Sequence, residues 1–344
     1  MTTPVYRSRA PLRLGLAGGG TDVSPYSDEF GGCVLSASID LFSYCSISPR
    51  NDGKVCFRAP DRGESFHGAA EAVLPLNGGM LLHRAVYNRI VKQFNKGIPL
   101  PCHVATYSDA PAGSGLGTSS TMVVAILGAF KEWLNLPLGE YEIAHLAFEI
   151  ERLELALTGG KQDQYAAAFG GVNFMEFLGR DRVIVNPLNV SRSILNELQL
   201  SLVLYYTGVS RDSSKIISEQ VNNVKTGVIT SVEAMHGIKK DAIKMKEYLL
   251  RGELENFAAG LNRSWEHKKL MSSAISNQQI EEVFSIAMQA GASAGKVSGA
   301  GGGGYIMFMV DPVRKIELEK SLEQLDGSVQ RFHFTAEGMT SWCV

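Results

Sequence analysis

The sequence predicts a two-domain α+β protein. Its 344 residues exceed what one ordinary hydrophobic core contains. Strand-like alternation and helical periodicity both recur along the chain, and the 36 glycines gather in a few clusters. Clustered glycines allow a backbone to approach a ligand or another segment closely. We expect an N-terminal domain over residues 1–190 and a C-terminal domain over residues 191–344.

The composition is typical of a soluble globular enzyme. With 45% hydrophobic residues and a formal net charge of −2, the chain gives no electrostatic reason to expect a nucleic-acid or membrane partner. No apolar run approaches the roughly 20 residues of a membrane span, and the N-terminus lacks the apolar core of a signal peptide. Five cysteines without a Cys-x-x-Cys pair predict reduced thiols in a cytoplasmic protein. The seven histidines show no metal-ligand spacing.

The first strand pattern, residues 5–16, runs into the turn Ala-Gly-Gly-Gly-Thr-Asp, and residues 33–48 again read as strands. Arg13 interrupts an apolar pattern, where an arginine normally needs a buried anionic partner. Asp22 ends the glycine turn and could accept hydrogen bonds from a polyhydroxylated ligand. A surface-edge arginine and an Asx-turn or helix-capping aspartate are the alternatives, and both stay open here.

A second glycine-rich loop, residues 111–120, lies at the centre of the prediction. Residues 50–76 predict hairpins or a loop, residues 81–94 a helix and residues 102–107 a strand that leads into this loop. Its glycines favour backbone conformations whose N–H groups point into one concavity and hold an anion. Three hydroxyl residues then open an apolar helix, whose N-terminus attracts phosphate.

The hydroxyls of this loop could also reach a phosphate-bound Mg²⁺. The loop lacks the Gly-Lys-Ser/Thr ending of a Walker loop, so any nucleotide-binding fold here is a different one. A plain glycine-rich turn before a buried helix is the alternative.

Acidic residues follow in two places. Residues 139–157 predict a helix, in which Glu149 lies on a solvated face, Glu154 is intermediate and Glu151 lies in an apolar row. A carboxylate in an apolar row is costly unless it meets a cation, so Glu151 is a candidate Mg²⁺ ligand, or else part of a buried ion pair. Asp163 opens a helix of small residues, where the helix dipole and Lys161 favour its ionised form; simple N-capping is the alternative.

The second half predicts a strand at residues 199–206 and four long helices, followed by a third glycine cluster and strands near 304–310 and 328–336. The helices are expected at residues 212–226, 230–251, 253–268 and 276–290. The third cluster, residues 295–304, formally contains Gly-x-Gly-x-x-Gly, but it runs into a strand where a dinucleotide-binding loop runs into a helix. We therefore expect this backbone to pass close to a ligand or to another glycine loop.

Residues 10–22, 111–120 and 296–304 resemble, in order, the three motifs of the GHMP kinases. The resemblance covers essentially the whole chain. It implies a ribosomal protein S5 domain 2-like N-terminal domain and a ferredoxin-like C-terminal domain, with ATP and a sugar bound in the cleft between them.

The resemblance also implies roles for individual residues. Asp163 would act near the acceptor hydroxyl with Arg13 as its basic partner, and Ser119 and Glu151 would hold Mg²⁺. The ATP phosphates would contact Pro111, Gly113, Ser114, Gly115, Leu116, Gly117, Thr118, Ser119 and Ser120. The sugar would contact Gly19, Gly20, Thr21, Asp22, Lys161, Gly301 and Gly302.

The first motif is similar to those of the heptose 7-phosphate kinase and fucokinase branches, which phosphorylate an anomeric hydroxyl. Gly19 and Gly20 stand where galactokinases have Glu-His, which argues against galactose. The expected partners are ATP and a small sugar phosphate whose product is the 1,7-bisphosphate used for surface polysaccharide precursors; a homodimer is compatible with the pattern. A non-catalytic sugar-binding relative is the distant alternative. Candidates for holding the substrate's own phosphate are Lys161, Arg62, Arg211 and Lys215.

Overall fold

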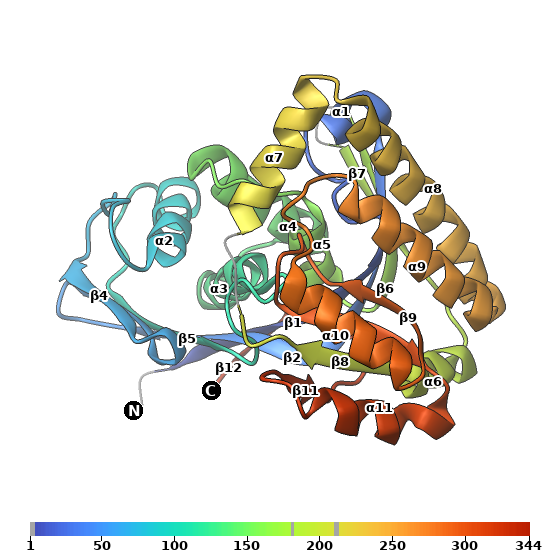
Figure 1. The fold of residues 1–344 in the computed structure, drawn as a ribbon. Helices are drawn as coiled ribbons and strands as arrows, with labels where there is room; N and C mark the ends of the chain where they lie inside the picture. Colours follow the sequence, from blue (N-terminus) through green and yellow to red (C-terminus); the bar gives the residue numbers. More distant parts are fainter. Residues whose placement is uncertain (1–3, 180–181, 210–212) are drawn as a thin grey trace.

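The computed structural model describes residues 4–179, 182–209 and 213–344, which form two lobes, each built on an antiparallel or mixed sheet with helices packed against it (Figure 1). The first sheet has the strand order β12-β1-β2-β5-β3-β4, with β6 and β7 continuing from β2. Its strands are β1 (Tyr6–Ala17), β2 (Gly32–Pro49), β3 (Lys54–Ala59), β4 (Glu64–Ala69), β5 (Cys102–Ser108), β6 (Val172–Leu178), β7 (Arg182–Pro187) and β12 (Thr340–Cys343).

Helices of the first lobe cover one face of this sheet. α3 is buried along most of its length because nearly every residue from Thr121 to Phe130 is apolar or small, and it packs against β1, β2 and α5. The helices of this lobe are α1 (Tyr26–Phe30), α2 (Leu81–Phe94), α3 (Thr118–Leu134), α4 (Glu140–Phe148) and α5 (Gln162–Phe169), with a π-helical segment at Glu149–Glu154 and a 3₁₀ turn at Pro60–Arg62.

The second lobe contains a four-stranded antiparallel sheet of order β11-β8-β10-β9. Its strands are β8 (Leu202–Tyr206), β9 (Ala292–Val297), β10 (Tyr305–Val310) and β11 (Ser328–Gln330). Its helices are α6 (Arg192–Ser201), α7 (Ser213–Lys225), α8 (Ile229–Arg251), α9 (Leu254–Lys269), α10 (Gln278–Gln289) and α11 (Lys315–Leu322), with a 3₁₀ turn at Pro312–Arg314.

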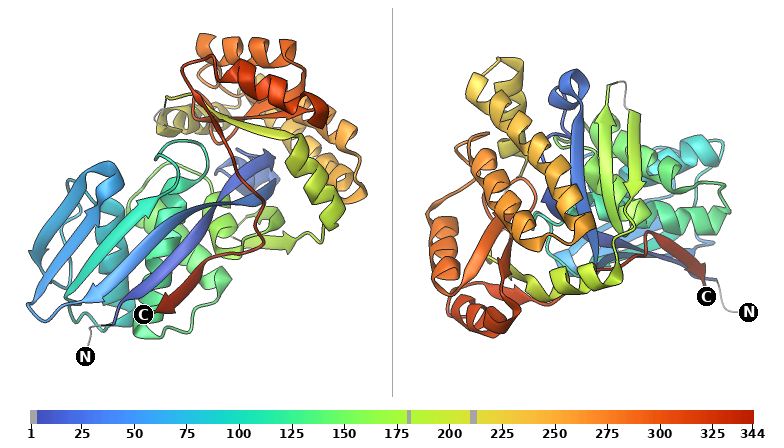
Figure 2. Two further views of the ribbon diagram at one scale, coloured as in Figure 1. Left: turned by 90° about the horizontal axis from the view of Figure 1, so that it is seen from below. Right: turned by 90° about the vertical axis from the view of Figure 1, so that its right-hand side faces the viewer.

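A large hydrophobic cluster contains residues of both lobes. Leu12, Leu14 and Leu16 of β1 pack in it with Leu204 of β8 and Met307 of β10. Apolar side chains alternate along β1, so Arg13 between them projects to the other side of the strand. The chain returns after β11 to pair β12 with β1, as both views in Figure 2 show. The geometry between the lobes is therefore fixed by buried apolar side chains and by strand pairing.

Most predicted elements match the structure, and a few do not. The helix expected at residues 81–94 is α2, and the hairpin region contains β3 and β4. The strand expected from residue 199 begins only at Leu202, because Ser191 caps a helix that continues to Ser201. The helix expected over 139–157 is α4 followed by the π-helical segment. The domain boundary at residue 190 stays a prediction.

Two further features concern membrane-spanning helices and the state of the cysteines. Within the described residues, no helix is long and apolar enough to cross a bilayer. All five cysteines are free; four are buried and Cys343 is exposed.

Candidate active site

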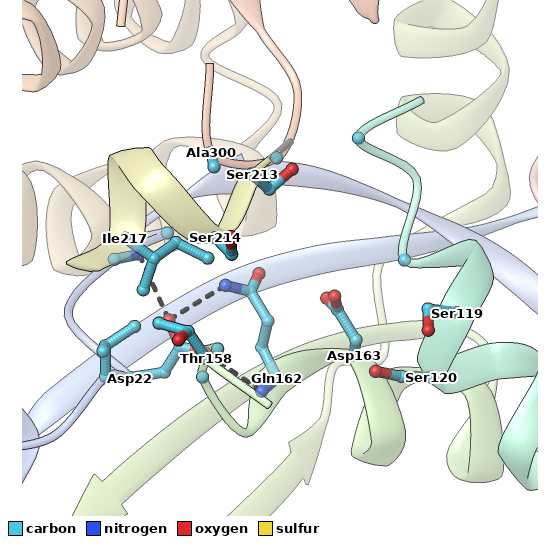
Figure 3. A pocket seen from close by; sticks show the side chains of 18 of the residues that line it. Asp22, Ser119, Ser120, Thr158, Gln162, Asp163, Ser213, Ser214, Ile217 and Ala300 are labelled. Carbon is cyan, nitrogen blue, oxygen red and sulfur yellow. Dashed lines mark hydrogen bonds between the residues drawn. The ribbon is translucent and has the colours of Figure 1, made fainter. Parts of the chain in front are cut away.

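A cavity of about 540 Å³ is lined by residues of all three glycine-rich segments and of α5, α7 and α9. Gly19 and Gly20 of the first turn line it, as do Gly299 and Ala300 of the third. Figure 3 shows Asp163 between Gln162 on one side and Ser119 and Ser120 on the other, with Ser213, Ser214 and Ala300 across the cavity.

The three glycine segments touch one another. The Ser298 hydroxyl donates to the carbonyl oxygen of Gly115 at 2.9 Å, and the Tyr305 N–H donates to that of Ser114 at 2.9 Å. On the other side, the backbone N–H of Arg13 donates to Leu116 at 3.2 Å. Gly115 has a φ of +86°, and a Cβ there would lie 2.5 Å from the Ser298 oxygen. Only glycine fits this close crossing.

The middle loop has the conformation expected for binding an anion. Gly113, Gly115 and Gly117 all have positive φ, and α3 begins directly after them. Ser119 is exposed in the cavity, whereas Ser120 is buried and its hydroxyl accepts from Gln164 at 3.1 Å. Of the predicted phosphate contacts, the ones lining the cavity are Gly113, Gly115, Gly117, Thr118, Ser119 and Ser120, whereas Pro111, Ser114 and Leu116 do not line it.

Asp163 and Arg13 form a close ion pair. The Asp163 Oδ1 atom lies 2.8 Å from Arg13 Nε and 2.6 Å from Arg13 Nη2. The same guanidinium donates through Nη1 to the Gly115 carbonyl oxygen at 2.7 Å, so Arg13 links the Asp163 carboxylate to the middle glycine loop. Arg13 is buried, while the Asp163 side chain keeps 23% of its surface exposed. Since Asp163 also lies in the first turn of α5, the helix dipole stabilises its charge. Arg13 and the start of α5 thus orient the Asp163 carboxylate, part of which is exposed in the cavity.

Glu151 is the buried carboxylate that the sequence pattern distinguished from its neighbours. Its side chain is 1% exposed and lines the cavity, and it accepts a 2.6 Å hydrogen bond from Gln164. Burial raises the pKa of Glu151, an effect that Arg152 at 3.6 Å partly offsets. Glu149 and Glu154 instead both pair with Arg89 on the surface side.

Asp22 has a different environment from the one expected for a sugar ligand. Its Oδ2 accepts from the backbone N–H groups of Lys161 at 2.9 Å and Gln162 at 3.1 Å, and its Oδ1 accepts from the Gly20 N–H and the Gln162 amide. Both oxygens are therefore saturated, and burial raises the Asp22 pKa. Asp22 lines the cavity but acts foremost as a cap that fixes the start of α5, and with it Asp163.

The other residues predicted to bind the substrate lie mostly outside the cavity lining. The Thr21 hydroxyl is buried against the carbonyl oxygens of Gly18 and Cys33. Lys161 is buried beside Phe148, and its ammonium lies 3.9 Å from Asp28. Lys161, Gly301 and Gly302 do not line the cavity. Arg62 pairs with Glu64, Lys215 is exposed on α7, and neither is a lining residue; Arg211 lies outside the described residues.

The sequence reasoning missed several lining residues. Arg152, Gln220 and Lys268 all contribute to the cavity. Burial, together with the nearby charge of Arg13, lowers the pKa of Lys268 to about 8. Its ammonium donates a hydrogen bond to the Gly299 carbonyl oxygen. No local sequence pattern distinguishes Lys268 as a site residue. It lies among basic residues at the end of α9, a pattern that is typical of a solvent-exposed helix end.

Family comparisons agree with this arrangement. The family model described as "GHMP kinases N terminal domain" matches residues 81–171, and the model "GHMP kinases C terminal" matches residues 245–325. The first match contains the middle glycine loop, Glu151 and Asp163.

Individual relatives match over most of this chain. The D-glycero-alpha-D-manno-heptose 7-phosphate kinase of Campylobacter jejuni is 50% identical over 336 residues, which is 98% of each chain. The L-fucokinase/L-fucose-1-P guanylyltransferase of Bacteroides fragilis is 28% identical over 92% of this chain and 36% of its own length.

Solved structures give the same result. A D-glycero-D-manno-heptose 1-phosphate kinase from Bacteroides thetaiotaomicron superposes with a TM-score of 0.83 at 49% identity, covering 98% of both chains. Lactococcus lactis galactokinase has the same fold, with a TM-score of 0.75 at 17% identity over 98% of this chain and 95% of the galactokinase. The two-domain fold, the converging glycine segments and the full-length identity lead to one conclusion: this chain belongs to the GHMP kinase family.

Proposed function

We propose that this protein is an ATP-dependent sugar kinase that phosphorylates the anomeric hydroxyl of D-glycero-D-manno-heptose 7-phosphate to give the 1,7-bisphosphate. The observation that carries the proposal is the carboxylate of Asp163, which Arg13 holds in the cavity beside the glycine-rich start of α3. The full-length identity to the Campylobacter jejuni enzyme supports the choice of sugar.

Backbone groups and the α3 dipole would hold the phosphates of ATP. The positive φ values of Gly113, Gly115 and Gly117 turn this loop into a concavity, and the unsatisfied N–H groups of the first helical turn carry partial positive charge. Phosphoryl transfer needs little covalent help from a protein, so positioning and charge neutralisation supply most of the rate.

Asp163 would orient the acceptor hydroxyl and accept its proton. Its carboxylate has an exposed part in the cavity, and Arg13 fixes its direction through Oδ1. The same arginine, bonded to the Gly115 carbonyl, lies where it can offset charge on the transferring group.

The oxygen donors of the cavity fit Mg²⁺. Magnesium takes one or two carboxylates and completes its shell with water and phosphate, and Glu151 is a buried carboxylate that lines the cavity with the Ser119 and Ser120 hydroxyls. The described residues hold no cluster of three or more histidine, cysteine or acidic side chains suited to a metal, in keeping with an ion bound mainly by phosphate. We propose Ser119 and Glu151 as its protein ligands. When bound, Mg²⁺ would neutralise phosphate charge.

The names of the relatives leave two heptose phosphates to compare, because one relative is named a 7-phosphate kinase and another a 1-phosphate kinase. A fucokinase is the second candidate, supported by the weaker match to part of the relative named L-fucokinase/L-fucose-1-P guanylyltransferase. The matches to the two heptose kinases are almost equal, at 50% and 49% identity over 98% of each chain. We retain the 7-phosphate because the first glycine motif resembles that of the heptose 7-phosphate kinases.

The test is coupled ADP release by the purified protein across a panel of acceptors. The panel contains heptose 7-phosphate, heptose 1-phosphate, unphosphorylated heptose, fucose and galactose, each with ATP and Mg²⁺. We expect the highest kcat/KM with heptose 7-phosphate. A preference for fucose would replace the proposed substrate, and sugar binding without ADP release on any acceptor would identify a non-catalytic relative.

Location and assembly follow from the proposed role. A kinase that consumes ATP and carries only free cysteines is expected in the cytoplasm. A homodimer is compatible with the fold and stays a prediction.

A further inference from the structure

Lys268 of the second lobe lines the same cavity as Arg13 and Asp163 of the first lobe. Lys268 is the penultimate residue of α9, is 3% exposed and lines the cavity with Arg13 and Asp22. Its ammonium donates to the Gly299 carbonyl oxygen in the third glycine segment. That segment packs against the phosphate loop, because a Cβ on Gly299 would lie 2.6 Å from the Gly115 Cα. Lys268 therefore lies near the point where the three glycine segments meet.

The charge balance of the cavity distinguishes Lys268 from the other cations there. Arg13 pairs with Asp163, and Arg152 lies 3.6 Å from Glu151. Within the described part of the chain, no carboxylate comes within ion-pair distance of Lys268.

Asp22, whose negative charge raises the Lys268 pKa against the effect of burial, already accepts four hydrogen bonds. An ammonium has three N–H donors, and a single backbone acceptor does not balance the cost of burying its positive charge. An anion that enters the cavity supplies the missing negative charge and a further acceptor.

A second buried lysine shows what a purely structural role looks like. The Lys296 ammonium donates to the Gly15 carbonyl at 2.9 Å and lies 3.5 Å from that of Leu16, joining β9 to β1, and Lys296 does not line the cavity. Lys268 differs because it has one acceptor and faces the space where phosphate groups would bind.

We propose that the Lys268 ammonium binds a phosphoryl group in this cavity. The group is a phosphate monoester or anhydride oxygen, from either the transferring γ-phosphoryl of ATP or the phosphate that the acceptor sugar already carries. The proposal rests on the proposed kinase function. It gives the cavity one phosphate-binding cation from each lobe, Arg13 on β1 and Lys268 on α9.

The test compares K268M, K268R and the matched control K269M. Lys269 is the next residue on the same helix end and pairs with Glu266 outside the cavity. Steady-state kinetics with heptose 7-phosphate and with unphosphorylated heptose separate the two sources of phosphate. We expect K268M to lower kcat/KM for heptose 7-phosphate about tenfold or more, K268R to recover part of it, and K269M to match wild type.

A similar loss with both acceptors identifies the transferring phosphoryl, and a loss confined to heptose 7-phosphate identifies the sugar's own phosphate. Wild-type kinetics of K268M with a lowered melting temperature would overturn the proposal, because Lys268 would then only anchor the Gly299 carbonyl. If K268M does not fold, K268Q takes its place.

Calorimetric titration with ATP and with heptose 7-phosphate gives a readout independent of turnover. If the wild type shows no turnover at all, the proposed function fails. In that case, equal affinities of wild type and K268M for both ligands refute the role of Lys268, and a weaker affinity of K268M for either ligand upholds it.

Discussion

Asp163 owes its geometry to two partners that are distant in the sequence. Arg13 holds its Oδ1, and Asp22 caps the start of the helix that carries it. The carboxylate is thus aimed by one buried guanidinium and by the placement of α5. An acid–base group fixed this way can act on a bound hydroxyl without moving.

Replacing Asp163 with asparagine tests this role at the residue scale. D163N keeps the size of the side chain but removes its charge, so the acceptor hydroxyl loses its proton acceptor. We expect kcat to fall by roughly two to four orders of magnitude. The affinity for ATP, measured by calorimetric titration, should stay close to that of the wild type. A variant with undiminished kcat would remove Asp163 from the chemistry.

At the scale of elements, the middle glycine loop, residues 111–120, packs closely against the backbone of the third glycine segment. Gly115 has positive φ, and an added Cβ would meet the Ser298 carbonyl oxygen at 2.5 Å. Gly97 has a φ of +76° with nothing within 4 Å of an added Cβ, so it serves as a control for strain alone.

We expect G97A to cost about 1 kcal/mol of unfolding free energy and to keep the wild-type kcat. G115A should cost more than G97A and should also lose most of its turnover, because the loop must move away from Ser298. Urea denaturation and ADP release measure the two effects. Equal behaviour of the two variants would show that the crossing of the glycine segments has no role in the site.

The packing of α2 on β5 predicts a pH dependence of stability. Burial lowers the pKa of His83 from 6.5 to about 3, and its Nε2 lies 2.8 Å from the Thr106 hydroxyl. Between these two pKa values the unfolded chain binds a proton that the folded protein does not, so stability falls as the pH falls below about 6.5.

When the pH falls from about 7 to about 5, protonation of His83 in the unfolded chain should lower the free energy of unfolding by about 2 kcal/mol. The H83Q variant should not show this decrease. His67 is exposed on β4, so H67Q should retain the wild-type dependence. Urea denaturation at the two pH values gives the comparison. The same pH dependence in H83Q as in the wild type would contradict the buried neutral state.

At the scale of the whole molecule, the site is assembled where the two lobes meet. β1 carries Arg13 toward α5 while its leucines pack in the cluster shared with β8 and β10. α9 supplies Lys268 from the second lobe. The arrangement of the proposed site residues thus depends on apolar contacts between the two lobes.

Sequence patterns predicted the parts of this arrangement that are local. The glycine loop before an apolar helix, the apolar row around Glu151 and the polar start of α5 all involve neighbours within a few residues. β9 escaped prediction because Ala-Ser-Ala-Gly-Lys-Val offers few β-branched residues, and it forms a strand through pairing with β10.

Contacts between residues that are distant in the sequence could not be predicted from local sequence patterns. Three of the four hydrogen bonds of Asp22 come from Lys161 and Gln162, which lie 139 and 140 residues away in the chain, so its capping role stayed one of two alternatives. Lys268 looks like one of several basic residues at a helix end until the fold buries it beside Gly299.

A crystal structure with a non-hydrolysable ATP analogue, Mg²⁺ and heptose 7-phosphate tests the central claim most directly. We expect the terminal phosphoryl group between the Gly113–Ser120 loop and the sugar, and the anomeric oxygen within hydrogen-bond distance of the Asp163 carboxylate. A triphosphate bound outside the converging glycine segments, or a sugar whose anomeric oxygen points away from Asp163, would contradict it.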